Sequence, residues 1–118
     1  MANFLFIYRG GSDAESQYSP EEIQQYMQKW MDWIGEGFQK GWMVDPGDAL
    51  KPEALVVNAK KVVSDGPFPE SKEVVGGYSV VTTKSLKEAA EIAKGCPGLL
   101  AGGSVEVREL AGLAPPKS

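Results

Sequence analysis

The sequence predicts an α+β domain with the ferredoxin-like order βαββαβ and an extra hairpin strand, in which two helices cover one face of an antiparallel sheet. Three observations predict this class. Apolar residues alternate in the segments expected to be strands. Two amphipathic segments each begin with Ser and carry Glu three residues later, the pattern of a helix N-terminus. A chain of 118 residues has room for one domain, expected over residues 1–112, with residues 113–118 as a short flexible tail.

The first strand is expected over residues 3–9, as a central strand, because both of its alternating faces are apolar. These side chains are Phe4, Phe6 and Tyr8 on one face and Leu5 and Ile7 on the other.

The first helix is expected to begin at Pro20, after the N-cap Ser19, with Glu22 completing a capping box. Its apolar side chains up to residue 40 fall in one sector about 160° wide, which exceeds the stripe needed to cover a sheet. The flanks of the sector carry Met31 and Trp33, which we interpret as core plus part of a dimer contact. An aromatic box for a ligand is the alternative.

The middle of the chain is expected to be rich in turns. Residues 41–52 contain two prolines and a Gly-Asp pair, which predicts a connection, and the aliphatic segments 55–57 and 61–63 predict a short hairpin. The segment from Asp65 to Pro69 is expected to be an ordered loop, because its two prolines cannot donate hydrogen bonds to a sheet.

The last third predicts a strand, a helix and a strand. Gly76 and Gly77 open a strand over residues 78–83, with a bulge or close backbone approach expected at the glycines. A second capping box at Ser85 and Glu88 begins a helix, which Gly95 and Pro97 end. Its expected small-residue face consists of Leu86, Ala89, Ala90 and Ala93.

The closing strand is expected over residues 104–110, with Val105 and Val107 on one face and Glu106 and Arg108 on the other. Both helices are expected on the same side of the sheet, so the other face needs a cover. Since the chain predicts no further helix, a second copy is the simplest cover, and a homodimer is expected.

Composition excludes several classes of function. The chain has no His, which removes Ser-His-Asp and Cys-His catalysis and imidazole ligands, so neither a metal nor a cofactor is expected. The single Cys96 is interpreted as an incidental thiol, and a cytoplasmic location is expected. The net charge of -4, the pI near 4.8 and the lack of a long apolar run predict neither a nucleic-acid partner nor a membrane span.

One block carries a family resemblance. Residues 65–78 read DGPFPESKEVVGGY, and residues 103–108 read GSVEVR. These motifs resemble the DGPF-containing branch of the YCII-related family. The resemblance implies a dimeric α+β barrel with two ferredoxin-like sheets face to face, and it implies no established reaction for this branch. YCII relatives are thought to use a His-Asp pair, whose His is missing here.

Asp65 is the candidate catalytic residue, with two readings. Its carboxylate would cap nearby backbone amides in an Asx turn, or it would stand at a cleft mouth beside Phe68 and Tyr78 as an acid/base group or ligand anchor. Glu73, next to Lys72, is a further candidate that is either solvated or ion-paired.

Glu106 and Arg108 are expected to point between the two sheets. They form either an intersheet ion pair that holds the dimer or an anchor for an anionic or carbonyl-bearing ligand. Tyr8, Arg9 and Tyr78 lie at strand ends and are expected in the same pocket. The predicted function is a homodimeric small-molecule-binding or accessory protein with a cleft near the DGPF loop. The alternative is a cofactor-independent enzyme that acts on a small polar or anionic substrate through Asp65, a tyrosine and Arg108.

Overall fold

The computed structural model describes residues 1–10, 18–66 and 73–113. In chain order the elements are β1 (Ala2–Arg9), α2 (Pro20–Lys40), β2 (Met43–Ala49), β3 (Val56–Val57), β4 (Val63–Ser64), β5 (Val75–Thr83), α3 (Leu86–Ala93), the 3-10 helix η2 (Pro97–Ala101) and β6 (Ser104–Glu109).

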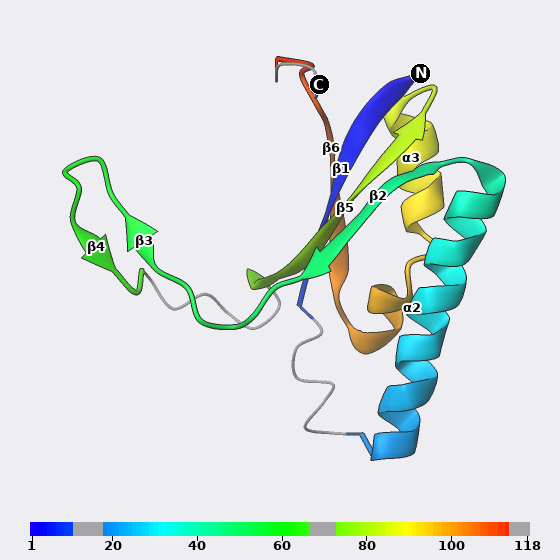
Figure 1. The fold of residues 1–118 in the computed structure, drawn as a ribbon, viewed down its shortest axis with the longest axis horizontal. Helices are drawn as coiled ribbons and strands as arrows, with labels where there is room; N and C mark the ends of the chain where they lie inside the picture. Colours follow the sequence, from blue (N-terminus) through cyan, green and yellow to red (C-terminus); the bar gives the residue numbers. More distant parts are fainter. Residues whose placement is uncertain (11–17, 67–72, 114–118) are drawn as a thin grey trace.

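Four of the strands form one antiparallel sheet in the order β2-β5-β1-β6, so β1 is central as expected. Helices α2 and α3 pack on the same face of this sheet, and the other face carries no helix (Figure 1). The predicted α+β, ferredoxin-like arrangement is confirmed.

The core lies between the sheet and the two helices. Phe4 and Phe6 of β1 are fully buried there, and the Trp33 indole stacks on the Phe6 ring with 6.3 Å between ring centroids. The other buried apolar residues of this core are Met43, Val81, Ala89, Ala93 and Cys96. Alternation along β1 therefore places its aromatic face under the helices and leaves Leu5 and Ile7 on the open face.

Helix α2 begins as the sequence predicts. The Glu22 backbone N–H donates to the Ser19 hydroxyl, and the Ser19 backbone N–H donates to the Glu22 carboxylate, each at 3.2 Å. Gly41, with φ 85°, ends the helix in the left-handed conformation.

Trp33 belongs to the core, which is one of the two roles expected for the flanks of this helix. Its side chain is buried inside the chain, whereas Met31 is 64% exposed. The Trp33 ring contacts Tyr8 of the first strand and Trp42, so this side of α2 is buried.

Residues 43–49 form a strand, where the sequence analysis expected a turn-rich connection. β2 pairs with β5 at the sheet edge, and its register with β5 shifts twice, once between Met43 and Asp45 and once between Asp45 and Asp48. The second shift spans Pro46 and Gly47, which an edge strand tolerates because one side of it needs no hydrogen bonds.

The predicted hairpin forms, but it stands apart from the main sheet. β3 and β4 pair only with each other, as a separate two-stranded sheet, and this hairpin projects away from the helices and the sheet (Figure 1). β2 is therefore the second strand of the βαββαβ plan, and the hairpin is an insertion outside the four-stranded sheet rather than an extra strand within it.

Helix α3 departs from the expected pattern in two ways. Leu86 and Ala90 are exposed, and only Ala89 and Ala93 of the expected small-residue face are buried. The Ser85 hydroxyl accepts from the Glu88 N–H as predicted, but the Glu88 carboxylate accepts from the Lys84 N–H, so only half of the second capping box forms.

Among the described residues, no helix combines the length and the apolar character that a membrane crossing requires.

Candidate functional site

The open face of the sheet, the face without helices, carries most of the candidate site. Residues paired directly across antiparallel strands share a face. One row across the sheet is therefore Asp48, Tyr78, Ile7 and Glu106, and the next is Asp45, Val80, Leu5 and Arg108. Both rows combine an apolar centre with polar groups at the sheet edges.

Arg9, Glu106 and Arg108 form a charged cluster on this face. The Arg9 Nε–H donates to Glu106 Oε1 at 3.2 Å, and Arg108 Nη1 lies 3.7 Å from Glu106 Oε2. Arg9 Nη1 also donates to the Glu73 carbonyl oxygen at 2.9 Å. The Arg9 and Glu106 side chains are 33% and 39% exposed, and Arg108 is 71% exposed, so both guanidinium groups can be reached from solvent.

A bulge in β5 lies opposite Arg9. Tyr8 pairs with Gly77 of β5, and Arg9 pairs with Val75, so Gly76 is the extra residue. A Cβ on Gly77 would lie 2.8 Å from the Asp48 carbonyl oxygen, so this position needs the close backbone approach that the Gly76–Gly77 pair predicts.

Asp45 and Asp48 were missed by the sequence analysis, because residues 41–52 were assigned to a connection. Their carboxylates accept from backbone N–H groups of their own strand, Gly47 for Asp45 and Ala49 for Asp48, at 2.9 and 2.8 Å. The signal was weak, because Pro46 and Gly47 interrupt the alternation that identifies a strand.

Tyr8 and Tyr78 lie on opposite faces of the sheet, so the structure does not bring them into one pocket. Tyr78 is on the open face and 38% exposed. Tyr8 is on the covered face, where its ring meets Trp30 edge to face at 4.8 Å. Its hydroxyl donates to Ser79 Oγ at 2.8 Å, and Ser79 donates to the Pro46 carbonyl oxygen at 2.7 Å. Burial raises the pKa of Tyr8, so this hydroxyl remains protonated and acts as a hydrogen-bond donor.

Asp65 is exposed at the end of the hairpin, and within the described part of the chain its carboxylate makes no hydrogen bond or ion pair. Glu73 is exposed and contacts Arg9 through its backbone carbonyl. Phe68 lies outside the described residues.

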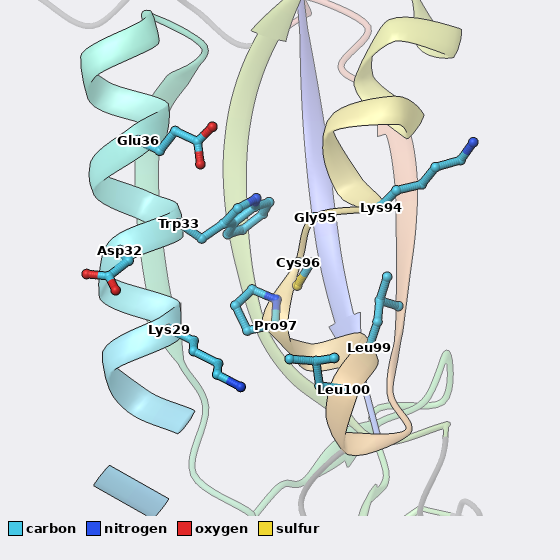
Figure 2. Close-up of a pocket in the computed structure, with 10 residues that line it drawn as sticks. All are labelled: Lys29, Asp32, Trp33, Glu36, Lys94, Gly95, Cys96, Pro97, Leu99 and Leu100. Carbon is cyan, nitrogen blue, oxygen red and sulfur yellow. The ribbon is translucent and has the colours of Figure 1, made fainter. Parts of the chain in front are cut away.

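A groove of about 370 Å³ lies on the other side of the molecule, between α2 and η2 (Figure 2). Trp33, Cys96 and Pro97 line it together with charged side chains of α2. Glu36 of this rim pairs with Lys40 at 2.6 Å, and Lys94 pairs with Glu91 at 2.9 Å. Glu36 and Lys94 are therefore each paired with a charged side chain close by in the sequence.

Cys96 supplies no nucleophile to that groove. Burial raises the pKa of the Cys96 thiol to about 11, so the thiol is protonated at neutral pH. A second hollow, of about 530 Å³, lies between the first residues of β1 and residues 110–113. Neither hollow includes a predicted site residue, and in the described part of the chain the charged cluster lies on the open face of the sheet.

Comparison with known proteins gives similar solved structures and a matching family. The fold is similar to that of 5-chloro-2-hydroxyhydroquinone dehydrochlorinase (TftG) from Burkholderia phenoliruptrix AC1100, solved in complex with 2,5-dihydroxybenzoquinone. The TM-score is 0.50 at 13% identity, over 93% of each chain. At this identity the likeness shows the fold alone. No curated protein sequence matches the chain.

The model of the YCII-related domain matches residues 11–112. This match covers most of the chain and agrees with the resemblance carried by the DGPF block. The chain therefore belongs to the YCII-related domain family.

Proposed function

We propose that this protein is a homodimeric small-molecule-binding or accessory protein, and that its ligand is a small anionic or carbonyl-bearing compound held on the open face of the sheet. The observation that carries the proposal is the Arg9–Glu106–Arg108 cluster, which sets two guanidinium groups and one carboxylate beside apolar side chains. Two cations against one anion leave the cluster one positive charge.

The geometry suits anion binding because Arg9 is held in place before any ligand arrives. Glu106 and the Glu73 carbonyl fix one edge of its guanidinium group, and no described residue accepts from its remaining N–H groups, which can contact an oxyanion. Arg108 is more exposed and can approach the same ligand from beside Leu5.

The neighbouring apolar side chains suit a flat ring. Leu5, Ile7 and Val80 lie in the centre of the two rows, and Tyr78 adds an aromatic face and a hydroxyl. Ligand sites commonly combine an apolar surface with a few polar groups that fix orientation.

A second copy of the chain is needed to enclose the ligand. Sites for small ligands bury most of the ligand surface, and one chain leaves this face open. A second copy placed over it would convert the open face into a cavity between two chains. The bound 2,5-dihydroxybenzoquinone of the structural relative, a small oxygen-rich ring, supports this class of ligand.

The test of binding is thermal unfolding with 2,5-dihydroxybenzoquinone and a panel of small carboxylates. A ligand at 100 times its Kd that binds only the folded protein adds about 2.7 kcal/mol to the free energy of unfolding. Arg108→Gln should keep the Tm of the free protein, because the side chain is mostly exposed, and should lose the ligand-induced rise.

The matched control is Lys87→Gln, which removes one exposed positive charge from α3 on the covered side of the sheet. This variant should keep the full rise. An equal loss in both variants would reduce the effect to net charge, and an unchanged rise in Arg108→Gln would contradict the proposed site.

A second candidate function is a cofactor-independent enzyme that acts on a ligand of the same class. The structural relative favours it, since that protein is a dehydrochlorinase. Tyr78 and Arg108 on the open face, with Asp65, would carry the chemistry; Tyr8 is less suited because it is buried on the other face.

Chloride release from 5-chloro-2-hydroxyhydroquinone tests this second function. An enzyme of this kind should lose most of its rate in Asp65→Asn and Tyr78→Phe while retaining its fold. Chloride release no faster than in buffer, from a protein that still binds the panel ligands, would leave only the binding function.

A further inference from the structure

The β3–β4 hairpin is an arm with no cover in the described chain. We define the arm as residues 55–66. Its five aliphatic side chains are between 46% and 70% exposed; they are Leu55, Val56, Val57, Val62 and Val63. The arm extends away from the rest of the fold (Figure 1).

The arm has a defined conformation although it pairs with no strand of the main sheet. The Asn58 side-chain oxygen accepts from the Lys60 and Val62 N–H groups, at 2.9 and 3.0 Å, and so closes the tip. Gly66, with φ 74°, packs close to the Val56 side chain at the base. A lone two-stranded hairpin is at best marginally stable in water. A surface against the arm would supply the missing stabilisation.

The open face of the sheet is the second uncovered apolar surface of the same chain. A stable interface uses about 20 to 30 residues on each side. The arm has twelve residues, and the outward positions of β1, β5 and β6 supply only a similar number, so neither surface reaches that size alone. Together they do, and a symmetric pair of copies buries both surfaces in each copy.

The charge of the arm tip also favours a second copy of the chain as the partner that the arm contacts. The arm tip carries Lys60 and Lys61, both exposed. The chain's net charge of -4 includes these two lysines, so the rest of the chain carries -6. The open face of a second copy presents the exposed carboxylates of Asp45 and Asp48 along β2, so the basic tip has acidic partners on the face where it would dock.

We propose that the arm of one copy docks on the open face of a second copy and brings its Asp65 beside the Arg9–Glu106–Arg108 cluster there, so that two chains build each site. This inference rests on the proposed function for the role of the cluster. Asp65 is exposed at the arm base and makes no described contact within its own chain, while the cluster has one positive charge in excess. The Asp65 carboxylate would balance that charge and complete a ring of donors and acceptors around a bound ligand.

Cross-linking between two differently tagged chains tests the arrangement without any ligand. One chain carries Asp65→Cys and the other Arg108→Cys; both positions are exposed, and the native Cys96 is buried. The two chains are coexpressed, purified through both tags in sequence and treated with a short bis-maleimide. We expect a covalent product of twice the 12.7 kDa chain mass that carries both tags.

The matched control pairs Asp65→Cys with Lys87→Cys, an exposed position on the covered side. It should give little of the product that carries both tags. A chain with both Asp65→Cys and Arg108→Cys that cross-links only within itself, at the mass of one chain, would overturn the inference.

Three other outcomes would also overturn it. Failure to recover both tags together would exclude the paired copies. Flotation of a monomer with vesicles of phosphatidylcholine and phosphatidylglycerol, abolished by Val57→Asp, would instead make the arm a membrane contact. Ligand binding to a monomer in the thermal assay would sustain the cluster as a site and exclude only the shared construction.

Discussion

At the scale of single residues, Trp33 is the centre of the buried aromatic cluster. Its ring lies 6.3 Å from Phe6, 5.9 Å from Trp30 and 5.2 Å from Trp42, measured between centroids. Aromatic contacts of this kind add to the energy of burial. The cluster joins α2 to the central strand and to the residue before β2, so one side chain connects three parts of the fold.

Replacement of Trp33 by Ala should therefore lower the free energy of unfolding by about 3 to 5 kcal/mol. Met31→Ala, two residues away and 64% exposed, should change it by less than about 0.5 kcal/mol. Urea denaturation of the two variants checks the difference. Similar losses for both would mean that Met31 has a cover in the assembled protein.

Because the Cys96 thiol is buried, the folded protein should lose stability at alkaline pH. Its pKa is about 11 in the folded protein, above the ordinary value of 9.0, because burial disfavours the thiolate. Below pH 9 both states keep the proton. Between pH 9 and 11 the thiol ionises first in the unfolded chain, so rising pH favours unfolding by roughly 2 kcal/mol over that window.

The measurement is denaturation at several pH values from 8 to 11, for the native protein and Cys96→Ala. Tyr8 and Tyr26, whose pKa values burial also raises, add their own alkaline loss to both proteins, and the part of it that comes from the Cys96 charge is lost with Cys96 in the variant. The native protein should lose more stability than the variant. Parallel curves would contradict a buried thiol with a raised pKa.

At the scale of elements, β2 departs most from the local pattern. It contains Pro46 and a left-handed Gly47, and it still pairs with β5 over its length. Ser79 of β5 donates to the Pro46 carbonyl, and the Tyr78 ring lies against Gly47, so contacts with β5 hold the irregular segment in the sheet.

Gly47→Ala should destabilise the protein more than Gly41→Ala. Both glycines have positive φ, at 66° and 85°, a conformation that costs other residues about 1 to 2 kcal/mol. A Cβ on Gly47 would also lie 1.9 Å from the Tyr78 carbonyl oxygen, whereas one on Gly41 meets nothing within 4 Å. Thermal unfolding compares the two, and equal losses would show that β2 can move away from β5.

At the scale of the whole molecule, two apolar surfaces have no cover within the described residues, the open face and the arm. The chain is thin in one direction, with extents of 42 × 41 × 27 Å, as a single sheet covered on one side must be. The proposed symmetric pair of copies would cover both surfaces with one interface, and the family resemblance also implies a dimer.

Sedimentation equilibrium at micromolar concentration should therefore give twice 12.7 kDa. Leu5→Lys, which introduces a charge into the centre of the open face, should shift the protein toward a single chain. Leu86→Lys on α3, at a leucine that is 52% exposed on the covered side, should leave the mass unchanged. A native mass of 12.7 kDa would contradict both the dimer and the shared site.

The sequence by itself determined the elements whose signals are local. Ser19 and Glu22 predict the start of α2 because a cap involves residues only three positions apart. Alternation predicts β1 and β6, and it correctly separates Val105 and Val107 from Glu106 and Arg108. The Arg108 candidate and the open face both follow from this alternation.

Only the tertiary structure decided which residues meet. Arg9 and Glu106 are 97 positions apart, and no local pattern predicts that β1 and β6 are neighbours with these two side chains on one face. β2 escaped prediction because pairing with β5 outweighs the turn preference of its own Pro and Gly. Local preferences act over a few residues, whereas contacts between distant strands depend on the packing of the whole chain, and for that reason the candidate site emerged only with the fold.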